Sequence, residues 1–298
     1  MNGDLIELID KSYPKMSKGH KLIANYIKEH YDKAAFMTAL KFGQTVGVSE
    51  STVVRFASEL GFDGYPSLQT ALQDLMRKKL TTVQRIEVSS DKIGDEDILD
   101  KMLSLDIERI RRTMEETSHD DFNRAVEKIA NCQTIYIIGA RSSASLAQFL
   151  WYYFNLIFPQ VKLVHASTRS ELFEQIMRID EKDVLIGMSF PRYSRQTVLA
   201  LQYAQSRGAN VIAITDCKSS PLTNYADCSL YAKSDMASFV DSLVAPLSLI
   251  NALIVAVSIR NKDVVTKNFE RLEKIWHEYE VYEDSKPDSN SVKGKNHE

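Results

Sequence analysis

A cluster of polar side chains follows a buried strand in the stretch DVLIGMSFPRYSRQT, residues 183–197. The first part is almost entirely apolar, which is typical of a strand buried on both faces of a sheet. Hydroxyl and guanidinium groups then follow within nine positions: Ser189, Arg192, Tyr193, Ser194, Arg195 and Thr197. Such groups donate hydrogen bonds and carry positive charge, so the chemistry that they suit is the binding of a small anion.

A second cluster follows the apolar stretch TIYIIG, where residues 139–143 read Gly-Ala-Arg-Ser-Ser. Ligands of open parallel sheets bind beyond the carboxyl ends of the strands, and helices that begin there present free N–H groups and positive dipole ends. We therefore expect one anionic small-molecule site from both clusters. Its predicted residues are Arg141, Ser142, Ser143, Ser189, Arg192, Ser194, Arg195 and Thr197.

The plainer interpretation of these residues is structural. Ser142 and Ser194 suit the N-cap position of a helix, and each arginine taken alone suits the surface or an ion pair. Their joint occurrence at two strand ends favours the anion site. A third strand end, ITDCKSSPL, adds hydroxyls, although a proline after two serines is also ordinary turn chemistry.

A different constellation lies in TALKFGQTVGVSESTVVRFASELGFDGYP, residues 38–66. A helix that ends at Gly47 and a second helix from about Ser49 to Gly61 predict two short crossed helices, with Gly43 at the crossing and Val48, Val53 and Phe56 facing the core. The second helix presents hydroxyls and a guanidinium that suit a DNA groove. The predicted DNA-binding residues are Ser49, Ser51, Thr52 and Arg55. The alternative is an ordinary helical bundle whose polar face meets water.

The elements that must position these clusters change type along the chain. Helical periodicity dominates residues 4–79, and residues 80–96 lose it and are polar. After two further helices, short apolar strands alternate with helical stretches, which predicts a parallel α/β sheet. A long apolar helix from about residue 239 to 260 and an amphipathic helix from 263 to 281 follow. The strands expected are TIYIIG, VKLVHA, DVLIGMS, NVIAITD and CSLYA.

Composition narrows the class of protein. The chain has 298 residues, 44% hydrophobic and 26% charged, which permits a sizeable core and more than one domain. Three distant cysteines suggest neither disulfides nor a zinc site, and we expect no metal or cofactor. The acidic N-terminus and the lack of a long apolar run favour a cytoplasmic protein. Residues 1–80 carry 11 Lys and Arg against 9 Asp and Glu, a net +2, and the rest carry 26 against 31, a net −5.

An enzyme on such a sheet needs a tuned base beside its substrate. The candidates for an aldose–ketose isomerase are His165, Glu171 and Glu174, and a lone histidine at a strand end is more often structural. The chain has no triad order, P-loop or dinucleotide motif. Binding without turnover is therefore favoured, and the alternative is a phosphosugar isomerase with an accessory helical domain. A third possibility is an interaction protein that binds neither DNA nor metabolite.

The two constellations together resemble the RpiR/MurR-type bacterial transcriptional regulators. The front motif is VGVSESTVVRFASELGFDGYPSLQTAL, and the rear half is similar to a sugar-isomerase (SIS) domain. The resemblance implies a multidomain fold, an all-α helix-turn-helix bundle followed by an α/β SIS domain with a five-stranded parallel sheet. Two loops depart from the family: Arg141 replaces the second glycine of Gly-x-Gly-x-Ser, and residues 191–193 interrupt Ser-x-Ser-Gly-x-Thr, with Arg195 at its glycine.

The predicted organisation is a DNA-binding domain at 1–79, a linker at 80–96, a ligand-sensing and dimerisation SIS domain at 97–281 and a disordered tail at 282–298. The predicted function is a transcriptional regulator whose SIS domain binds a small anionic metabolite that modulates operator binding. The resemblance implies a phosphosugar, and a sugar acid fits the two altered loops as well. The expected partners are an inverted-repeat DNA operator, this metabolite and a second copy of the chain, in a homodimer or tetramer.

Overall fold

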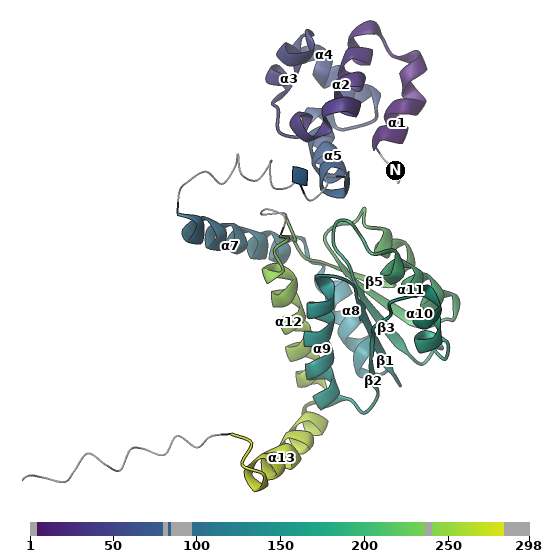
Figure 1. Cartoon of the computed structure of the whole chain (residues 1–298), viewed down its shortest axis with the longest axis vertical. Helices are drawn as coiled ribbons and strands as arrows, with labels where there is room; N and C mark the ends of the chain where they lie inside the picture. Colours follow the sequence, from purple (N-terminus) through teal and green to yellow (C-terminus); the bar gives the residue numbers. More distant parts are fainter. Residues whose placement is uncertain (1–4, 80–82, 85–96, 236–239, 283–298) are drawn as a thin grey trace, which may run out of the picture.

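The computed structural model describes residues 5–79, 83–84, 97–235 and 240–282, and the predicted linker and tail lie almost wholly outside these ranges. The N-terminal part consists of helices (Figure 1). The helices are α1 (Leu5–Ser12), the 3-10 turn η1 (Tyr13–Lys15), α2 (Lys18–Ala34), α3 (Ala39–Val46), α4 (Glu50–Glu59) and α5 (Gly64–Lys79). Their apolar faces form one core, in which Phe42 and Phe56 are fully buried.

The crossing of α3 and α4 is set by local sequence. Gly47 ends α3 in a left-handed conformation, with φ of 76°, and Ser49 then caps α4 by accepting a hydrogen bond from the Thr52 amide. A side chain at Gly43 would place its Cβ 2.7 Å from the Val48 carbonyl oxygen, so the close crossing needs glycine there. The predicted helix-turn-helix is confirmed.

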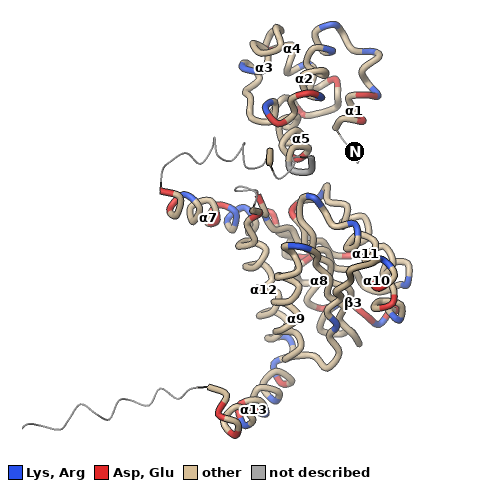
Figure 2. The backbone as a smooth tube through the Cα atoms, viewed as in Figure 1, with Lys and Arg blue, Asp and Glu red and all other residues tan. Residues whose placement is uncertain are grey.

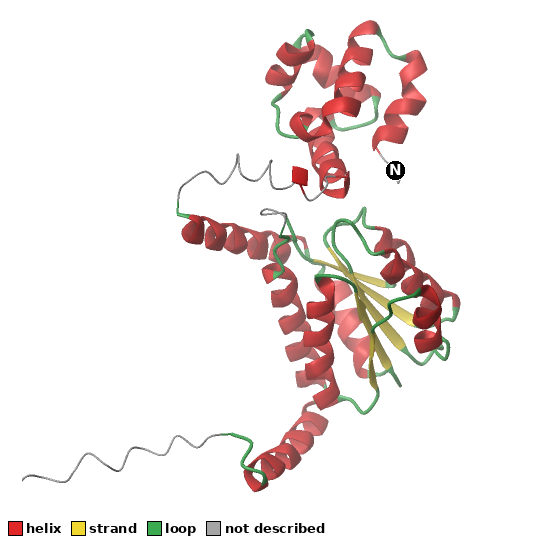
Figure 3. Cartoon of the chain, viewed as in Figure 1, coloured by secondary structure: helices red, strands yellow, loops and turns green. Residues whose placement is uncertain are grey.

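The C-terminal part begins with two helices and continues as alternating strands and helices (Figure 3). The helices are α7 (Ile98–Glu116), α8 (His119–Ala130), α9 (Ser143–Ile157), α10 (Arg169–Ile176), α11 (Arg195–Ser206), the 3-10 turn η2 (Pro221–Tyr225), α12 (Val244–Arg260) and α13 (Lys262–Glu278). The strands are β1 (Ile135–Gly139), β2 (Val161–Val164), β3 (Val184–Met188), β4 (Asn210–Thr215) and β5 (Cys228–Tyr231). All five predicted strands are confirmed.

The five strands form one parallel sheet in the order β2-β1-β3-β4-β5. In this order the chain leaves β1 toward one edge and β3 toward the other. The loops after β1 and β3 therefore separate at the carboxyl end of the sheet. This is the topological switch point, where open sheets hold their ligands.

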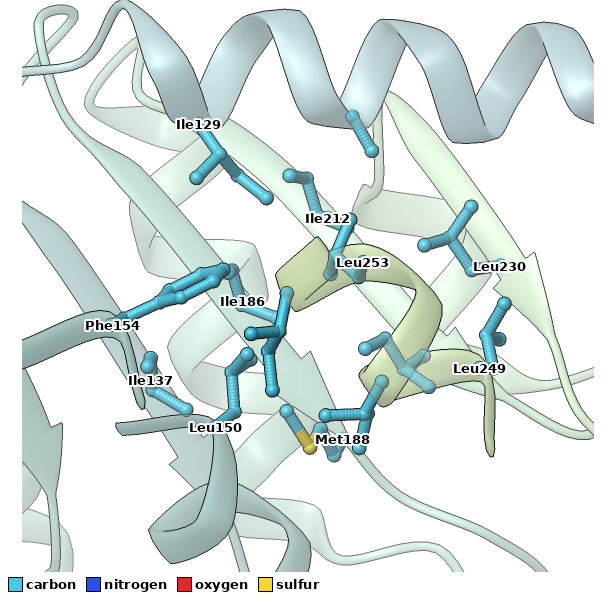
Figure 4. Packing of buried hydrophobic residues seen from close by; sticks show 14 of the residues in the cluster. Ile129, Ile137, Leu150, Phe154, Ile186, Met188, Ile212, Leu230, Leu249 and Leu253 are labelled. Atoms are coloured by element: carbon cyan, nitrogen blue, oxygen red, sulfur yellow. The ribbon is translucent and has the colours of Figure 1, made fainter. Parts of the chain in front are cut away.

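Helices cover both faces of the sheet. One core packs α8, α9 and α12 against a row of paired residues, Ile137, Ile186 and Ile212 (Figure 4). Leu150 of α9 and Leu253 of α12 point into it (Figure 4). The other core packs α10 and α11 on the opposite face. Helix α9 has no charged residue, and α12 has none before its last position, so both are drawn mostly in tan in Figure 2.

The prediction that the long apolar helix begins near residue 239 is wrong. Helix α12 begins at Val244, and residues 240–243 precede it as a loop. The physical reason is Pro246, which has no N–H to donate and is tolerated only in the first turn of a helix. A start near residue 239 would have buried this proline inside the helix.

Among the described residues, no single helix is both long and apolar enough to cross a bilayer. Of the described helices, only α12 and α13 taken together reach the required length and composition, and the chain bends by 97° between them.

Candidate functional sites

A pocket of about 350 Å³ lies at the switch point. The loops after β1 and β3 and the segment before α12 surround it. Six of the eight predicted anion-site residues line it: Arg141, Ser142, Ser143, Ser189, Arg192 and Ser194. Helices α9 and α11 both begin at this pocket, so their N-terminal amides and dipoles favour a negative guest. The geometry thus joins two clusters that are some fifty positions apart in the sequence.

The two pocket arginines hold an unusual backbone conformation. Arg141 has φ of 58° and Arg192 has φ of 65°, the left-handed region that favours glycine. Each costs on the order of 1–2 kcal/mol relative to glycine. A strained backbone that persists in two loops of one pocket is characteristic of functional sites, where strain is retained because the side chain contributes to function. Arg141 therefore holds a backbone conformation that favours glycine and adds a guanidinium to the pocket.

The serines divide into capping and open positions. Ser194 caps α11, since its Oγ accepts the Thr197 amide at 3.3 Å, and Ser189 Oγ accepts the Ser194 amide at 2.9 Å. The plainer interpretation therefore holds for Ser194, which caps a helix and still lines the pocket. Ser142 is at the N-cap position of α9 but makes no capping hydrogen bond, and Ser143 is buried in the first turn. We therefore expect Ser142 to be the hydroxyl most open to a guest.

Two predicted residues do not line the pocket. Arg195 is exposed on the first turn of α11. Thr197 is fully buried, and its methyl group lies against β3, where a Cβ at Gly187 would approach it to 3.4 Å. The Thr197 hydroxyl has no hydrogen-bond partner among the described residues. The expectation that these two side chains reach the guest is corrected, because the first turn of α11 points one outward and the other into the core.

A hydrogen-bonded brace holds the loop after β3. Tyr193 donates a hydrogen bond to the Asp216 carboxylate at 2.7 Å, and Thr215 donates to the Ser189 carbonyl at 2.8 Å. Burial, and then the adjacent Asp216 charge, raise the pKa of the Tyr193 hydroxyl above its ordinary value, so it remains a donor. The third strand end thus supports the pocket from behind, and Tyr193 is a positioning residue.

One wall of the pocket consists of residues that were not predicted from the sequence. Val240, Asp241 and Leu243 line it from the segment before α12, and Phe190 and Pro191 line it from the β3 loop. Residues 240–243 read Val-Asp-Ser-Leu and run directly into the apolar stretch from Val244, so they looked like the start of the long helix. Pro246 was the signal that they are a loop, because a helix must begin within a turn of it. Asp241 gives the pocket a carboxylate, which suits donation from ligand hydroxyls.

The candidate isomerase bases lie outside this pocket. Glu171 accepts the Ser167 amide at 2.7 Å while Thr168 accepts the Glu171 amide, so the two form a capping arrangement at the start of α10. Glu174 accepts a hydrogen bond from Ser170 at 2.8 Å. The backbone of His165 is held on both sides by Gln175. These contacts are structural, and none of the three side chains lines the pocket.

The predicted DNA-binding residues share the exposed start of α4. Arg55 Nε donates to the Ser51 carbonyl at 3.2 Å, and both side chains are exposed. Ser49 Oγ is within hydrogen-bond distance of the hydroxyls of Ser51 and Thr52, at 2.9 and 2.8 Å. The methyl group of Thr52 faces α2 at Gly19. Ser51 and Arg55 therefore form the outward edge, whereas Ser49 and Thr52 also hold the helix in place.

A second cavity, of about 540 Å³, opens at the amino ends of the strands. Lysines and glutamates line it together, including Lys128, Lys182, Glu127 and Glu181, so it has no net preference for an anion. In the described parts of the chain, no three His, Cys, Asp or Glu side chains are grouped as metal ligands would be.

Comparisons with known proteins agree with this two-part architecture. The family model described as a helix-turn-helix domain of the rpiR family matches residues 3–79, and the SIS domain model matches residues 128–256. An uncharacterized HTH-type transcriptional regulator of Clostridium perfringens (strain 13) is 25% identical over 228 residues, 76% of this chain and 80% of the relative. The uncharacterized HTH-type transcriptional regulator YfhH of Escherichia coli (strain K12) is 25% identical over 237 residues, 78% of this chain and 81% of YfhH.

Solved structures show the same fold. The sugar isomerase domain of an RpiR transcription factor from Sphaerobacter thermophilus is 26% identical, with a TM-score of 0.57, and covers 59% of this chain and 98% of its own. The NanR protein of Vibrio vulnificus, complexed with ManNAc-6P, is 20% identical, with a TM-score of 0.58, and covers 93% of this chain and 99% of its own. At 20% identity, the similarity to NanR shows a shared fold.

Fold and sites together define the class, a helix-turn-helix protein with a SIS domain behind it. The chain belongs to the RpiR family of HTH-type transcriptional regulators, as the order of its two domains and its curated relatives show.

Proposed function

We propose that this regulator senses a small anionic metabolite, a phosphosugar or a sugar acid, in the pocket at the β1/β3 switch point. The observation that carries the proposal is the convergence of Arg141 and Arg192, both in a strained left-handed backbone, on one pocket at two helix N-termini. The sugar phosphate named with the Vibrio vulnificus structure supports the same class of guest. Asp241 adds an acceptor for sugar hydroxyls.

The proposed DNA interface is the exposed start of α4. Ser51 and Arg55 are its reading edge, while Ser49 caps α4 and Thr52 packs against α2. We infer that the chain acts in the cytoplasm as a homodimer or tetramer that presents paired recognition helices to an inverted repeat. Apolar side chains left exposed on α7, such as Leu103 and Ile107, support assembly with a second copy. A ligand changes DNA affinity only to the extent that its own affinity differs between the DNA-binding arrangement of the oligomer and the arrangement that does not bind DNA.

The ligand proposal is tested by calorimetric titration with a panel of hexose 6-phosphates, their aldonic acids and inorganic phosphate. We expect at least one organic member to bind the wild-type chain. Arg192→Ala and Ser194→Ala should abolish that binding and any ligand response, yet leave basal DNA binding intact. Arg207→Ala, an exposed arginine at the other end of α11, is the matched control. Unchanged binding in both pocket variants would refute the anion site.

The DNA proposal is tested by selecting duplexes from a random pool with the full-length chain. We expect enrichment of an inverted repeat, and Arg55→Ala should weaken its binding by about 1–3 kcal/mol if Arg55 contacts a base edge. Lys33→Ala is the control, since Lys33 is exposed at the far end of α2 from Gly19. Unaltered affinity in the Arg55 variant, with the oligomer intact, would remove Arg55 from the interface.

Steady turnover of a sugar phosphate would instead favour the isomerase. Its candidate bases, His165, Glu171 and Glu174, lie away from the pocket, so the structure gives that alternative no support.

A further inference from the structure

The segment before α12 belongs to two sites at once. Asp241 and Leu243 line the anion pocket, and Ser242, the residue between them, is buried and points its hydroxyl to α7. Neighbouring residues of a chain cannot move independently, because the backbone fixes their spacing. A displacement of this pocket wall therefore reaches Ser242 directly.

The contact with α7 is a buried polar joint. Ser242 Oγ donates to Asp106 Oδ1 at 2.7 Å, and Arg109 Nη1 donates to the same oxygen at 2.7 Å. Arg109 is only 4% exposed, and the Nε atom of its guanidinium has no hydrogen-bond partner among the described residues. A buried guanidinium depends strongly on its carboxylate, so changes at Asp106 are energetically large.

The same loop region is tied to the second half of α7. The Lys233 amide donates to Thr113 Oγ1 at 2.9 Å, and the Thr117 hydroxyl donates to the Tyr231 carbonyl at 3.0 Å. Ser234 in turn donates to the Ser242 carbonyl at 3.0 Å. Helix α7 is therefore held by polar bonds both at the end of β5 and at the pocket wall.

Among the helices with described bounds, α7 is the next one after α5 in the chain, since α5 ends at Lys79 and α7 begins at Ile98. On the basis of the proposed function, we propose that the joint of Ser242, Asp106 and Arg109 transmits occupancy of the anion pocket to α7, and that Ser242 and Asp106 are the positioning residues of this coupling. An anion attracted by Arg141 and Arg192 changes the electrostatic balance at Asp241, and the shift of residues 241–243 alters the bonds that hold Asp106.

The experiment measures amide hydrogen exchange of the full-length chain with and without saturating ligand, for whichever member of the sugar-phosphate and aldonic-acid panel binds. In the wild type we expect exchange in residues 98–116 to change by at least about threefold on binding, as a shift in local opening would produce. In Ser242→Ala and Asp106→Asn the ligand should still bind within about threefold of the wild-type Kd, and the change in α7 should disappear.

Two control variants match the chemistry of the tested residues. Glu108→Gln alters an exposed carboxylate on α7 that pairs with Arg111, and Ser248→Ala alters a hydroxyl of α12 that bonds its own helix. Both should keep the wild-type response. Asp106→Asn removes the charge that pairs with the buried Arg109, so this variant can fail to fold. In that case the test uses the milder Ser242→Ala variant alone.

The outcomes separate this inference from the proposed function. If no member of the panel binds the wild-type chain, the proposed function fails, and the coupling fails with it. If ligand binds and exchange in α7 is unaltered, or if both joint variants keep the wild-type response, the coupling alone is wrong.

Discussion

At the scale of single residues, the pocket depends on side chains that its backbone does not favour. Arg141 and Arg192 occupy positions where glycine is the least strained choice. Their guanidinium groups and the helix N-termini give the pocket its positive character, whereas Asp241 adds a negatively charged hydrogen-bond acceptor. The ligand is thus expected to combine an anionic group with hydroxyl donors, as phosphosugars and sugar acids do.

Arg192→Gly and Arg141→Gly should separate stability from binding. Glycine relieves the left-handed strain but adds conformational freedom to the unfolded chain, so we expect a free energy of unfolding within about 1 kcal/mol of the wild type, or higher. Anion affinity should fall in both variants. Thermal denaturation and calorimetric titration measure the two quantities, and a glycine variant that still binds tightly would show that its guanidinium is dispensable.

Tyr65 predicts an alkaline weakening of the DNA-binding domain. Its hydroxyl donates to the Met37 carbonyl at 2.7 Å, and burial raises its pKa to about 12. The unfolded value is about 10, so the contribution is complete below pH 10 and is lost as the pH rises from 10 to 12. Tyr65→Phe should cost about 1 kcal/mol at pH 8. Urea midpoints of both chains at pH 8 and pH 11 should converge, and a constant gap would contradict this assignment.

At the scale of elements, the sequence predicted most where local geometry decides. Gly47 and Ser49 mark the end of one helix and the start of the next, and the structure keeps both boundaries. The strands of the sheet were recognisable because burial on both faces leaves unbroken apolar runs. That the residues following β1 and β3 lie at one end of the sheet followed from the parallel strands. The Asp241 wall did not, because its apolar neighbours hide a boundary that only Pro246 marks.

The α3–α4 crossing should be sensitive to a single methyl group. Gly43→Ala places a Cβ 2.7 Å from the Val48 carbonyl oxygen, which we expect to destabilise the domain by about 1–3 kcal/mol. Gly19→Ala is the control, because its Cβ would meet Thr52 at 3.4 Å within a helix where alanine is favoured by up to about 1 kcal/mol. Urea denaturation followed by circular dichroism compares them, and equal stabilities would mean that the crossing can widen.

At the scale of the whole molecule, the two sites lie on separate parts of one chain, and their charges suit different partners. Residues 1–80 carry a net +2, and the remainder carries a net −5, so the front part is the one that an anionic duplex attracts. The domain limits at 1–79, 80–96 and 97–281 stay a prediction, as does the homodimer or tetramer. Helix α13, none of whose residues is buried, is a further surface on which copies of the chain are expected to meet.

DNA association should be strongly salt-dependent. If the recognition domain neutralises several phosphates, affinity should fall by about tenfold for every two phosphates contacted as monovalent salt rises from 50 to 200 mM. Fluorescence anisotropy with the selected duplex measures this slope, and sedimentation velocity on the same samples reports the oligomer. An affinity indifferent to salt would argue for the interaction protein that binds no DNA.

The strand order β2-β1-β3-β4-β5 has a consequence for how this regulator can diversify. The pocket exists because the chain runs in opposite directions after β1 and β3, so no buried residue of the sheet has to be removed to accommodate a ligand. Pocket residues that lie in loops outside the strands, such as Arg141, Ser142 and Arg192, can therefore be exchanged while the sheet and its helices stay the same. We therefore expect related regulators to acquire new ligands through a few substitutions in these loops, without a change in the fold.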